Sequence, residues 1–279
     1  LANPEAWLER EMVRDPGLEA KVIAMDVLRN GGERVVPMDH LTDRFPTISN
    51  HTWAIRFERH ESWRQHGGFS QIRVQRTHDE VNWEELNQWV QSVLENNHIP
   101  ELCVIDDELD ATVYNLSHEQ PHGDQVLLSD LSAELYMDLE SLMSRSVSVE
   151  NGMFVSDVSS WPLPAIGIEH FSGRFLRNEE HEYLRSLTTG EQADNLYAYL
   201  ASQRLLLRPG FKFGCLWRAY ETGISVEHAP WLIQPVNDAA KNWEGICLAV
   251  RLAEGVNKRW LCASEFEGKW TFLNIQRSG

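Results

Sequence analysis

Apolar residues follow a helical period in some segments of the chain and a strand period in others. Leu18, Val22, Met25 and Leu28 share one helical face, and this helix is predicted to end at Gly31-Gly32. Downstream, the pattern predicts strand 52–57, strand 69–75, helix 82–95, and a hairpin of strands 101–105 and 111–116. The first part of the chain therefore has an α/β pattern.

The last part of the chain repeats this succession of elements. The pattern there predicts helix 193–203, strands 213–220 and 230–236, helix 243–255, and a hairpin of 259–264 with 270–276. The region between the two parts begins with a polar, turn-rich linker at 117–123. It then predicts a strand at 126–128, a helix at 131–144, strands within 147–155 and a helix at 179–188. We interpret this middle region as a small α/β subdomain.

Short sequence matches indicate that the two similar parts are copies of one unit. The tripeptide Asn-Trp-Glu occurs at 82–84 and again at 242–244. The fifteenth residue after its Trp is His98 in the first copy and Lys258 in the second. The final predicted strands of the copies also share a pattern of Thr, Asn and apolar residues. A duplication is therefore predicted, because such agreement in order and spacing is improbable by chance.

These elements place the chain in the α/β class with mixed sheets. We expect one repeat at 1–117, the small α/β subdomain at 118–190 and a second repeat at 191–279. Hydrophobic residues make up 42% of the 279 residues, which is enough to build buried cores and excludes a mainly disordered chain. The chain has no apolar run of about 18 residues, so no transmembrane helix and no membrane partner are expected.

The cysteines and histidines predict neither a disulfide scaffold nor a metal site. Cys103, Cys215, Cys247 and Cys262 lack Cys-x-x-Cys spacing, and we expect small buried hydrophobes in a protein of the reducing cytoplasm. The pair His118-x-x-x-His122 lies in the linker without helix or Cys partners, so no metal is expected. The chain also lacks a P-loop and a Gly-x-Gly-x-x-Gly motif, and no cofactor is expected.

Charge is distributed unevenly along the chain. The net charge of −17 argues against a nucleic-acid partner at first sight. From residue 203 onward, however, ten Lys and Arg stand against seven Asp and Glu, whereas the first 202 residues hold 15 basic and 35 acidic residues. Only five of the basic residues are Lys, and Arg is the better partner for phosphates and base faces. The last third is therefore locally basic on an acidic body.

The densest local signal lies in this basic third. It consists of Gly210-Phe-Lys-Phe-Gly-Cys-Leu-Trp-Arg-Ala-Tyr220, then Glu227-His-Ala-Pro-Trp-Leu-Ile233, then Lys258. In order and context these motifs resemble the archaeal tRNA-splicing endonucleases, over residues 125–279. An active repeat preceded by an inactive one corresponds to the two-repeat form of that family. The resemblance implies duplicated restriction-endonuclease-like α/β units and a homodimer that acts on intron-containing precursor tRNA rather than on DNA.

The resemblance also implies a chemistry for three residues. In metal-free RNA cleavage a ribose 2′-hydroxyl attacks the adjacent phosphate, giving a 2′,3′-cyclic phosphate and a 5′-hydroxyl. Tyr220 is then the base, His228 the acid and Lys258 the charge stabiliser, although the roles of the first two could be exchanged. A phenol is a weak base at its ordinary pKa of about 10, so a nearby cation must favour its phenolate. Histidine can carry and release a proton near neutrality.

The first copy lacks this set. Phe57 stands where the second copy has Tyr220, and it lacks the phenol hydroxyl. His66 corresponds to His228, but a titratable His98 replaces Lys258. We therefore expect the first copy to keep the scaffold and not to cut.

Two further groups of residues follow from the resemblance. Arg251 and Arg277 are the candidates for clamping a flipped bulge nucleotide, because guanidinium planes stack on unpaired bases. In the predicted hairpin turn of the first copy stand acidic residues expected to dock into a basic groove of the partner subunit, namely Asp106, Asp107, Glu108 and Asp110. This turn could also be merely a solvated acidic loop.

Two other classes of protein remain as alternatives. One is a non-catalytic structural or RNA-binding paralogue that keeps the fold. The other is a metal-dependent nuclease of the wider restriction-endonuclease-like group, which would need a carboxylate pair and a Lys on the core strands. The predicted set of Tyr220, His228 and Lys258 favours the splicing endonuclease over both.

Overall fold

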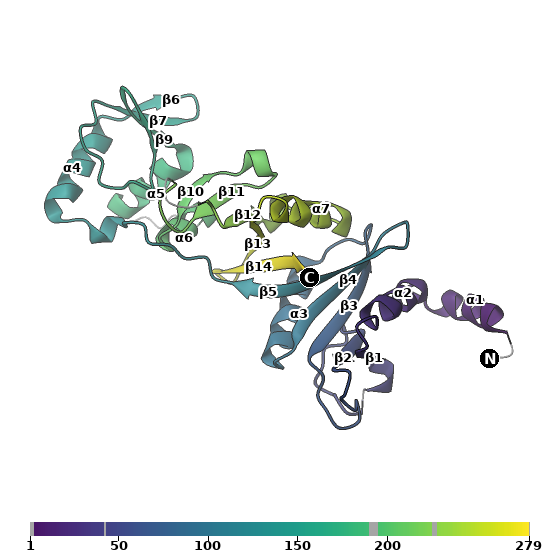
Figure 1. The fold of residues 1–279 in the computed structure, drawn as a ribbon. Helices are drawn as coiled ribbons and strands as arrows, with labels where there is room; N and C mark the ends of the chain where they lie inside the picture. The colour runs from purple at the N-terminus through teal and green to yellow at the C-terminus, as the bar shows by residue number, and fades with distance from the viewer. Residues whose placement is uncertain (1–2, 42, 190–194, 225–227, 279) are drawn as a thin grey trace. The chain divides into compact units, whose positions relative to one another are not determined.

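The computed structural model describes residues 3–41, 43–189, 195–224 and 228–278, and Figure 1 shows their elements. The chain divides into two compact units. Unit 1 consists of residues 1–119, 236–254 and 273–279, and unit 2 of residues 120–235 and 255–272. The last strand, β14 (Lys269–Arg277), contributes its N-terminal part to unit 2 and its C-terminal part to unit 1. Within the described ranges, no helix has the length and apolar character needed to cross a bilayer.

Unit 1 begins with two helices, α1 (Pro4–Arg14) and α2 (Leu18–Leu28). The periodicity predicted α2 at these bounds but did not predict α1. The buried face of α2 consists of Ala20, Ala24 and Leu28, while Val22 of the expected face is half exposed. Small Ala side chains let the helix approach the sheet closely, so this face packs against the strands although it is less hydrophobic.

The strands of unit 1 lie in the order β1-β2-β3-β4-β5, followed by the C-terminal part of β14. Their bounds are β1 (Arg34–Pro37), β2 (Ala54–Phe57), β3 (Ser70–Arg76), β4 (Ile99–Ile105) and β5 (Ala111–Glu119). Neighbouring strands of β1–β5 are antiparallel, except that β3 and β4 are parallel and joined by α3 (Trp83–Glu95). The side chain of Asn82 caps α3 by accepting from the N–H of Glu85 at 3.1 Å, and Leu86, Trp89, Val90 and Val93 form its buried face.

One helix of the second repeat, α7 (Trp243–Glu254), belongs to unit 1. The start of α7 and the residues before it form hydrogen bonds with the loop after β3. The N–H of Val81 donates to the carbonyl oxygen of Lys241 at 2.9 Å, and the N–H of Glu244 donates to the carbonyl oxygen of Thr77 at 2.8 Å. Ser278, just after β14, donates to the carbonyl of Val113 in β5 at 2.8 Å. The last strands of the two repeats, β5 and β14, are therefore neighbours in one sheet of the same chain.

The strands of unit 2 repeat the topology of unit 1. Their order is β10-β11-β12-β13 followed by the N-terminal part of β14, with bounds β10 (Leu206–Pro209), β11 (Trp217–Tyr220), β12 (Trp231–Pro235) and β13 (Arg259–Phe266). β10, β11 and β12 are antiparallel, and β12 and β13 are parallel, as β3 and β4 are. α6 (Leu196–Ser202) buries one face in the core of this unit.

The middle of the chain adds a second sheet to unit 2. It has the order β6-β7-β9-β8, all antiparallel, with strands β6 (Val147–Val149), β7 (Gly152–Ser156), β8 (Ile168–His170) and β9 (Gly173–Arg177). The helices α4 (Ala133–Ser144) and α5 (Asn178–Thr189) accompany it, close to their predicted bounds. The α/β class with mixed sheets is thus confirmed.

Two predicted strands need correction. The expected strand at 126–128 is wrong, because Leu128–Asp130 form a 3₁₀ turn in which the carboxylate of Asp130 accepts from the N–H of Leu127 at 3.0 Å. The expected strand at 213–220 begins only at Trp217. Before it, Phe211–Phe213 form a 3₁₀ turn that ends at Gly214 with a φ of 66°, a conformation that breaks the extended chain.

Candidate active site

The three predicted catalytic residues lie at one end of the strands of unit 2. Tyr220 is the last residue of β11, His228 lies three residues before β12, and Lys258 immediately precedes β13. Ala219 pairs with Trp231 across the antiparallel strands, and Trp231 pairs with Arg259 across the parallel ones. This register brings the end of β11 and the beginnings of β12 and β13 to the same edge, so residues distant in sequence converge there.

Ala229 connects the members of this set. Nζ of Lys258 donates to the carbonyl oxygen of Ala229 at 2.6 Å. Ala229 is itself buried in a small cluster with Tyr220, Leu206 and Ala165. The Tyr220 side chain is only 6% exposed, whereas His228, the neighbour of Ala229 in sequence, is exposed. The structure therefore holds two of the residues in packed surroundings and leaves the histidine open to solvent.

An aromatic ring and a second cation lie near Lys258. Its Nζ lies 5.8 Å from the centroid of the Phe213 ring, and the guanidinium of Arg218 lies 5.5 Å from the same centroid. Arg218 also lies 5.9 Å from the centroid of the Tyr220 ring. Burial, and then the like charge of Arg218, lower the pKa of Lys258 from its ordinary value. This lysine consequently loses its proton more readily than a solvated one.

A half-buried arginine, Arg208, lies beside the tyrosine and was not singled out from the sequence. Arg208 stands directly opposite Arg218 in the pairing of β10 with β11. It donates to the carbonyl oxygens of Ala165 and Gly167, each at 3.1 Å. Burial lowers the pKa of Arg208, while negative charge on Glu180 and on Tyr220 would raise it. Like charges directly opposite each other on adjacent strands destabilise a sheet. An arginine on each of two neighbouring strands was therefore a pattern in the sequence that could have drawn attention to both residues.

The matching positions in unit 1 carry structural side chains. Phe57 ends β2 and is fully buried, and His98 immediately precedes β4. Nδ1 of His98 lies 3.0 Å from Nε2 of Gln71, whose side-chain oxygen accepts from Thr52 at 2.8 Å. Burial lowers the pKa of His98, opposed by a hydrogen bond with the backbone of Gly67. At the lysine position of this repeat, the side chain is therefore part of a buried polar network.

The ring of His66 forms a local hydrogen bond in unit 1. Its Nδ1 accepts from the N–H of Ser62 at 3.2 Å, and its ring is exposed. Counted back from the first strand residues, His66 lies four positions before Ser70, whereas His228 lies three before Trp231. Because the register of the strands equates Ser70 with Trp231, the two histidines are offset by one residue.

Comparison with known proteins places this site in a family context. Residues 193–272, which include Tyr220, His228 and Lys258, match the sequence model described as tRNA intron endonuclease, catalytic C-terminal domain. The chain resembles the archaeal tRNA-splicing endonucleases. It is 30% identical over 122 residues to the tRNA-splicing endonuclease of Thermoplasma volcanium, an alignment that covers 44% of this chain and 40% of the relative.

A second archaeal relative gives a similar result. The chain is 24% identical over 139 residues to the tRNA-splicing endonuclease of Picrophilus torridus, which covers 50% of this chain and 46% of that protein. The chain therefore spans less than half the length of either curated relative it matches. The resemblance deduced from the motifs is confirmed.

The two arginines that are expected to clamp a bulge nucleotide, Arg251 and Arg277, lie in unit 1. Arg251 is exposed on α7, and Arg277 is the last residue of β14, where its N–H donates to the carboxylate of Glu254 at 2.9 Å. Both line a cavity of about 480 Å³, together with Tyr114 and Cys247. Burial raises the pKa values of both Tyr114 and Cys247. The structure thus brings the two arginines to one cavity that is also lined by the buried Tyr114 and the half-buried Cys247.

The predicted acidic turn lines the same cavity. Its members Asp106, Asp107, Glu108 and Asp110 connect β4 to β5. The side chain of Asp106 shapes the turn, because its Oδ1 accepts from the N–H groups of Glu108 and Asp110, each at 2.9 Å. The sequence did not indicate that the acidic turn and the two arginines would share one surface of unit 1.

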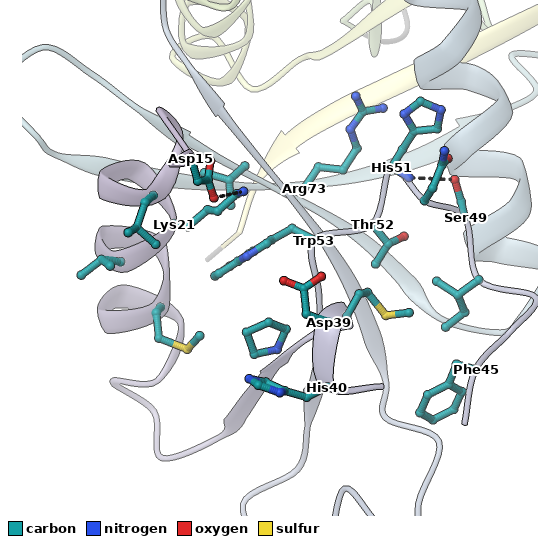
Figure 2. A pocket seen from close by; sticks show the side chains of 18 of the residues that line it. Asp15, Lys21, Asp39, His40, Phe45, Ser49, His51, Thr52, Trp53 and Arg73 are labelled. Carbon is teal, nitrogen blue, oxygen red and sulfur yellow. Dashed lines mark hydrogen bonds and ion pairs between the residues drawn. The ribbon is translucent and has the colours of Figure 1, made fainter. Parts of the chain in front are cut away.

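A further cavity of unit 1, of about 1140 Å³, is lined by none of the predicted site residues (Figure 2). Lys21 and Asp15 form an ion pair of 2.7 Å at its wall, and Trp53 faces its interior. Arg73 is held by Glu85 at 2.6 Å and lies 5.4 Å from the centroid of the Trp89 ring. Lys21 and Arg73, the lysine and arginine that line this cavity, are therefore each paired with a carboxylate of the protein.

Potential metal ligands are scattered among the described residues, where no three His, Cys, Asp or Glu side chains are grouped to hold a metal ion. In the linker, Nε2 of His118 lies 3.1 Å from Oδ1 of Asn87, and burial lowers the pKa of this histidine.

Proposed function

We propose that this chain is an RNA endonuclease that removes introns from precursor tRNA by cutting at bulge–helix–bulge splice sites. The observation that carries the proposal is the convergence of Tyr220, His228 and Lys258 at one edge of the strands in unit 2. This edge lies within the segment that matches the catalytic domain of tRNA intron endonucleases.

The proposed reaction is a metal-free internal transesterification. The ribose 2′-oxygen forms a bond to the adjacent phosphorus while the bond from phosphorus to the 5′-oxygen breaks. Tyr220 takes the 2′-hydroxyl proton, and His228 gives a proton to the departing 5′-oxygen, or the two exchange these roles. Lys258 stabilises the charge that develops on the phosphorane oxygens. The products are a 2′,3′-cyclic phosphate and a 5′-hydroxyl.

Arg208 and Arg218 support the phenol in this scheme. Arg218 lies over the ring of Tyr220, and Arg208 is half-buried near it. A phenol that acts as a base requires a nearby cation, and these two arginines are candidates for that role beside Lys258.

The assembly that we propose is a homodimer with one active site in each chain. The acidic turn of Asp106, Asp107, Glu108 and Asp110 would dock into a basic groove of the partner subunit. Since β5 and the end of β14 are already paired within the chain, these strand edges are occupied. The acidic turn therefore remains the candidate contact between subunits.

Cleavage of a synthetic bulge–helix–bulge RNA in EDTA tests the proposed activity. We expect cutting in the bulges, with 2′,3′-cyclic phosphate and 5′-hydroxyl ends identified by mass spectrometry. A non-catalytic paralogue would bind the RNA without cutting it, and a metal-dependent nuclease would cut only after Mg²⁺ is restored. Either result would overturn the proposal.

Arg251 and Arg277 are proposed to hold an unpaired bulge nucleotide. We expect Arg251→Ala to reduce cutting of bulged RNA more than it reduces binding of plain duplex RNA, because a duplex presents no unstacked base. Cleavage rates and filter-binding constants measure the two effects. Equal losses on both RNAs would reduce Arg251 to a phosphate contact.

A further inference from the structure

The loop between β10 and β11 exposes an aromatic side chain beside the candidate active site. Phe211 is 89% exposed, although it stands in a turn with hydrogen bonds at both ends. The N–H of Gly210 donates to the carbonyl of Leu216 at 2.8 Å, and the N–H of Phe213 to that of Gly210 at 2.7 Å. Exposure alone does not distinguish Phe211, since Phe171 is 96% exposed, but Phe211 belongs to the same turn as Phe213, whose ring lies beside Lys258.

The two glycines of this loop fix its shape. A Cβ on Gly210 would lie 2.2 Å from Sγ and 2.7 Å from the carbonyl oxygen of Cys215, so the backbone there is tightly packed. Gly214 has a φ of 66°, which L side chains rarely adopt. The loop therefore presents Phe211 in a defined position, with little conformational entropy left to lose when something binds.

The second aromatic of the loop anchors it to the catalytic cations. The ring of Phe213 lies beneath both Lys258 and Arg218, at 5.8 and 5.5 Å. Phe211 and Phe213 are separated by one residue, the exposed Lys212. One short turn thus carries an inward ring that holds the catalytic lysine, an outward ring in solvent and a surface cation.

We propose that Phe211 is a stacking platform for an unpaired base of the RNA, next to the bond that is cut. This inference rests on the proposed RNA endonuclease activity and adds a residue that determines substrate specificity. Unpaired bases stack on exposed aromatic rings, whereas bases within a helix are not accessible to them. Lys212 and Arg218 supply positive charge for the flanking phosphates on a chain with a net charge of −17.

Binding measurements on three variants test the platform. The probe is a bulge–helix–bulge RNA with 2′-deoxy sugars in the bulges, which cannot be cut because the attacking hydroxyl is missing. We expect Phe211→Ala to weaken its binding about tenfold. Phe211→Trp should retain binding, because the larger ring also stacks. Phe171→Ala is the matched control, since Phe171 is 96% exposed in the turn between β8 and β9 and should bind as the wild type does.

Abasic nucleotides identify the stacked base. Each unpaired position of the RNA is made abasic in turn, and binding is measured to the wild type and to Phe211→Ala. We expect one position where the abasic change weakens binding to the wild type and has no further effect on the variant. Equal effects on both proteins at every position would overturn the platform, and so would Phe211→Ala binding within twofold of the wild type.

Two outcomes separate this inference from the proposed function. If the wild type cuts bulged RNA and Phe211→Ala binds and cuts it equally well, the function stands and the platform is wrong. If binding depends on Phe211 but no cutting occurs, the platform is supported and the proposed cleavage is wrong. A Phe211→Ala variant that changes the oligomeric mass in ultracentrifugation without changing RNA affinity would show a protein contact and overturn the inference.

Discussion

Lys258 is the residue whose surroundings are most fully defined at the candidate active site. Its ammonium donates to the carbonyl of Ala229 at 2.6 Å, which directs the end of a flexible side chain. We expect Lys258→Ala and His228→Ala each to lower the cleavage rate at least about 100-fold, because both groups act mainly on the transition state. RNA affinity should change little. Single-turnover cleavage and equilibrium binding measure these two quantities.

The first repeat provides the matched controls for these variants. His66→Ala changes the histidine that the sequence matches to His228, one residue away from it in the strand register, and His98→Ala changes the position that corresponds to Lys258. Both variants should leave the cleavage rate unaltered. A rate within threefold of the wild type for Lys258→Ala or His228→Ala would remove that residue from the proposed mechanism.

The lowered pKa of Lys258 gives a second prediction at the residue scale. The like charge of Arg218 contributes to this lowering, so Arg218→Gln should raise the pKa of Lys258. Since the lysine stabilises charge only when protonated, the alkaline loss of cleavage should move to higher pH in the variant. NMR titration of ¹³C-labelled lysines reports the pKa directly, and with five lysines in the chain, Lys258→Arg identifies the signal.

The control for this titration is Arg145→Gln, the same change of charge at the exposed C-cap of α4. It should leave the Lys258 signal unmoved. If Arg218→Gln also leaves it unmoved, burial alone sets the pKa of this lysine.

At the scale of elements, the two repeats fill equivalent positions with opposite chemistry. In unit 1, Nη1 of Arg56 donates to the carboxylate of Glu101 at 2.7 Å, and Ser70 donates to the other oxygen of that carboxylate. Glu101 is only 3% exposed. In unit 2 the strand register gives the matching positions to apolar residues, namely Ala219, Trp231 and Leu261, all buried in its core. One topology therefore accepts either an ion pair or an apolar cluster at this place.

This difference predicts coupling between Arg56 and Glu101. Removing Arg56 leaves the buried carboxylate of Glu101 without its counterion, so Arg56→Ala should lower the free energy of unfolding by about 3–5 kcal/mol. Glu101→Leu should lower it by less, because Arg56 keeps a second carboxylate, that of Glu33, at 3.7 Å. The double variant adopts the chemistry of the other repeat and should lose less than the sum of the single variants. Urea denaturation of the four proteins measures the cycle, and additive losses would contradict the coupling.

At the scale of the whole molecule, the acidic turn decides whether the excess negative charge has a role in assembly. Changing Asp106, Asp107 and Asp110 together to Asn removes the charge and leaves a side-chain oxygen to shape the turn. If the turn docks into a partner, the triple variant should dissociate more readily and cut more slowly, because the partner's cations lose their counterions. Analytical ultracentrifugation and cleavage assays measure both effects.

A matched control and an opposite outcome make this test decisive. Glu265→Gln with Glu267→Gln changes the corresponding turn between β13 and β14 and should alter neither quantity. If the acidic turn is only solvated, the variant should keep its mass and bind RNA more tightly at low salt. The reason is that Arg251 and Arg277 share a cavity with the turn and would no longer be screened by it.

Elements whose boundaries are set by local chemistry were predictable from the sequence. The bounds of α2, α3 and α7 follow from apolar periodicity, capping side chains and glycines, all of which act within a few residues. The segment 126–128 has the apolar character of a strand, yet an ion pair of 2.7 Å between Arg204 and Asp130 accompanies a turn there. That contact spans 74 residues of sequence, and no local pattern contains it.

The sequence by itself determined the α/β class, the repeated succession of elements and the order of Tyr220, His228 and Lys258. These depend on spacing and residue type, both of which are contained in the linear sequence. Only the tertiary structure decided that Ala229 joins the tyrosine to the lysine, that Phe213 carries two cations, and that Phe211 faces solvent. Strand register and the direction of side chains fix such contacts, and both arise from packing between segments far apart in the chain.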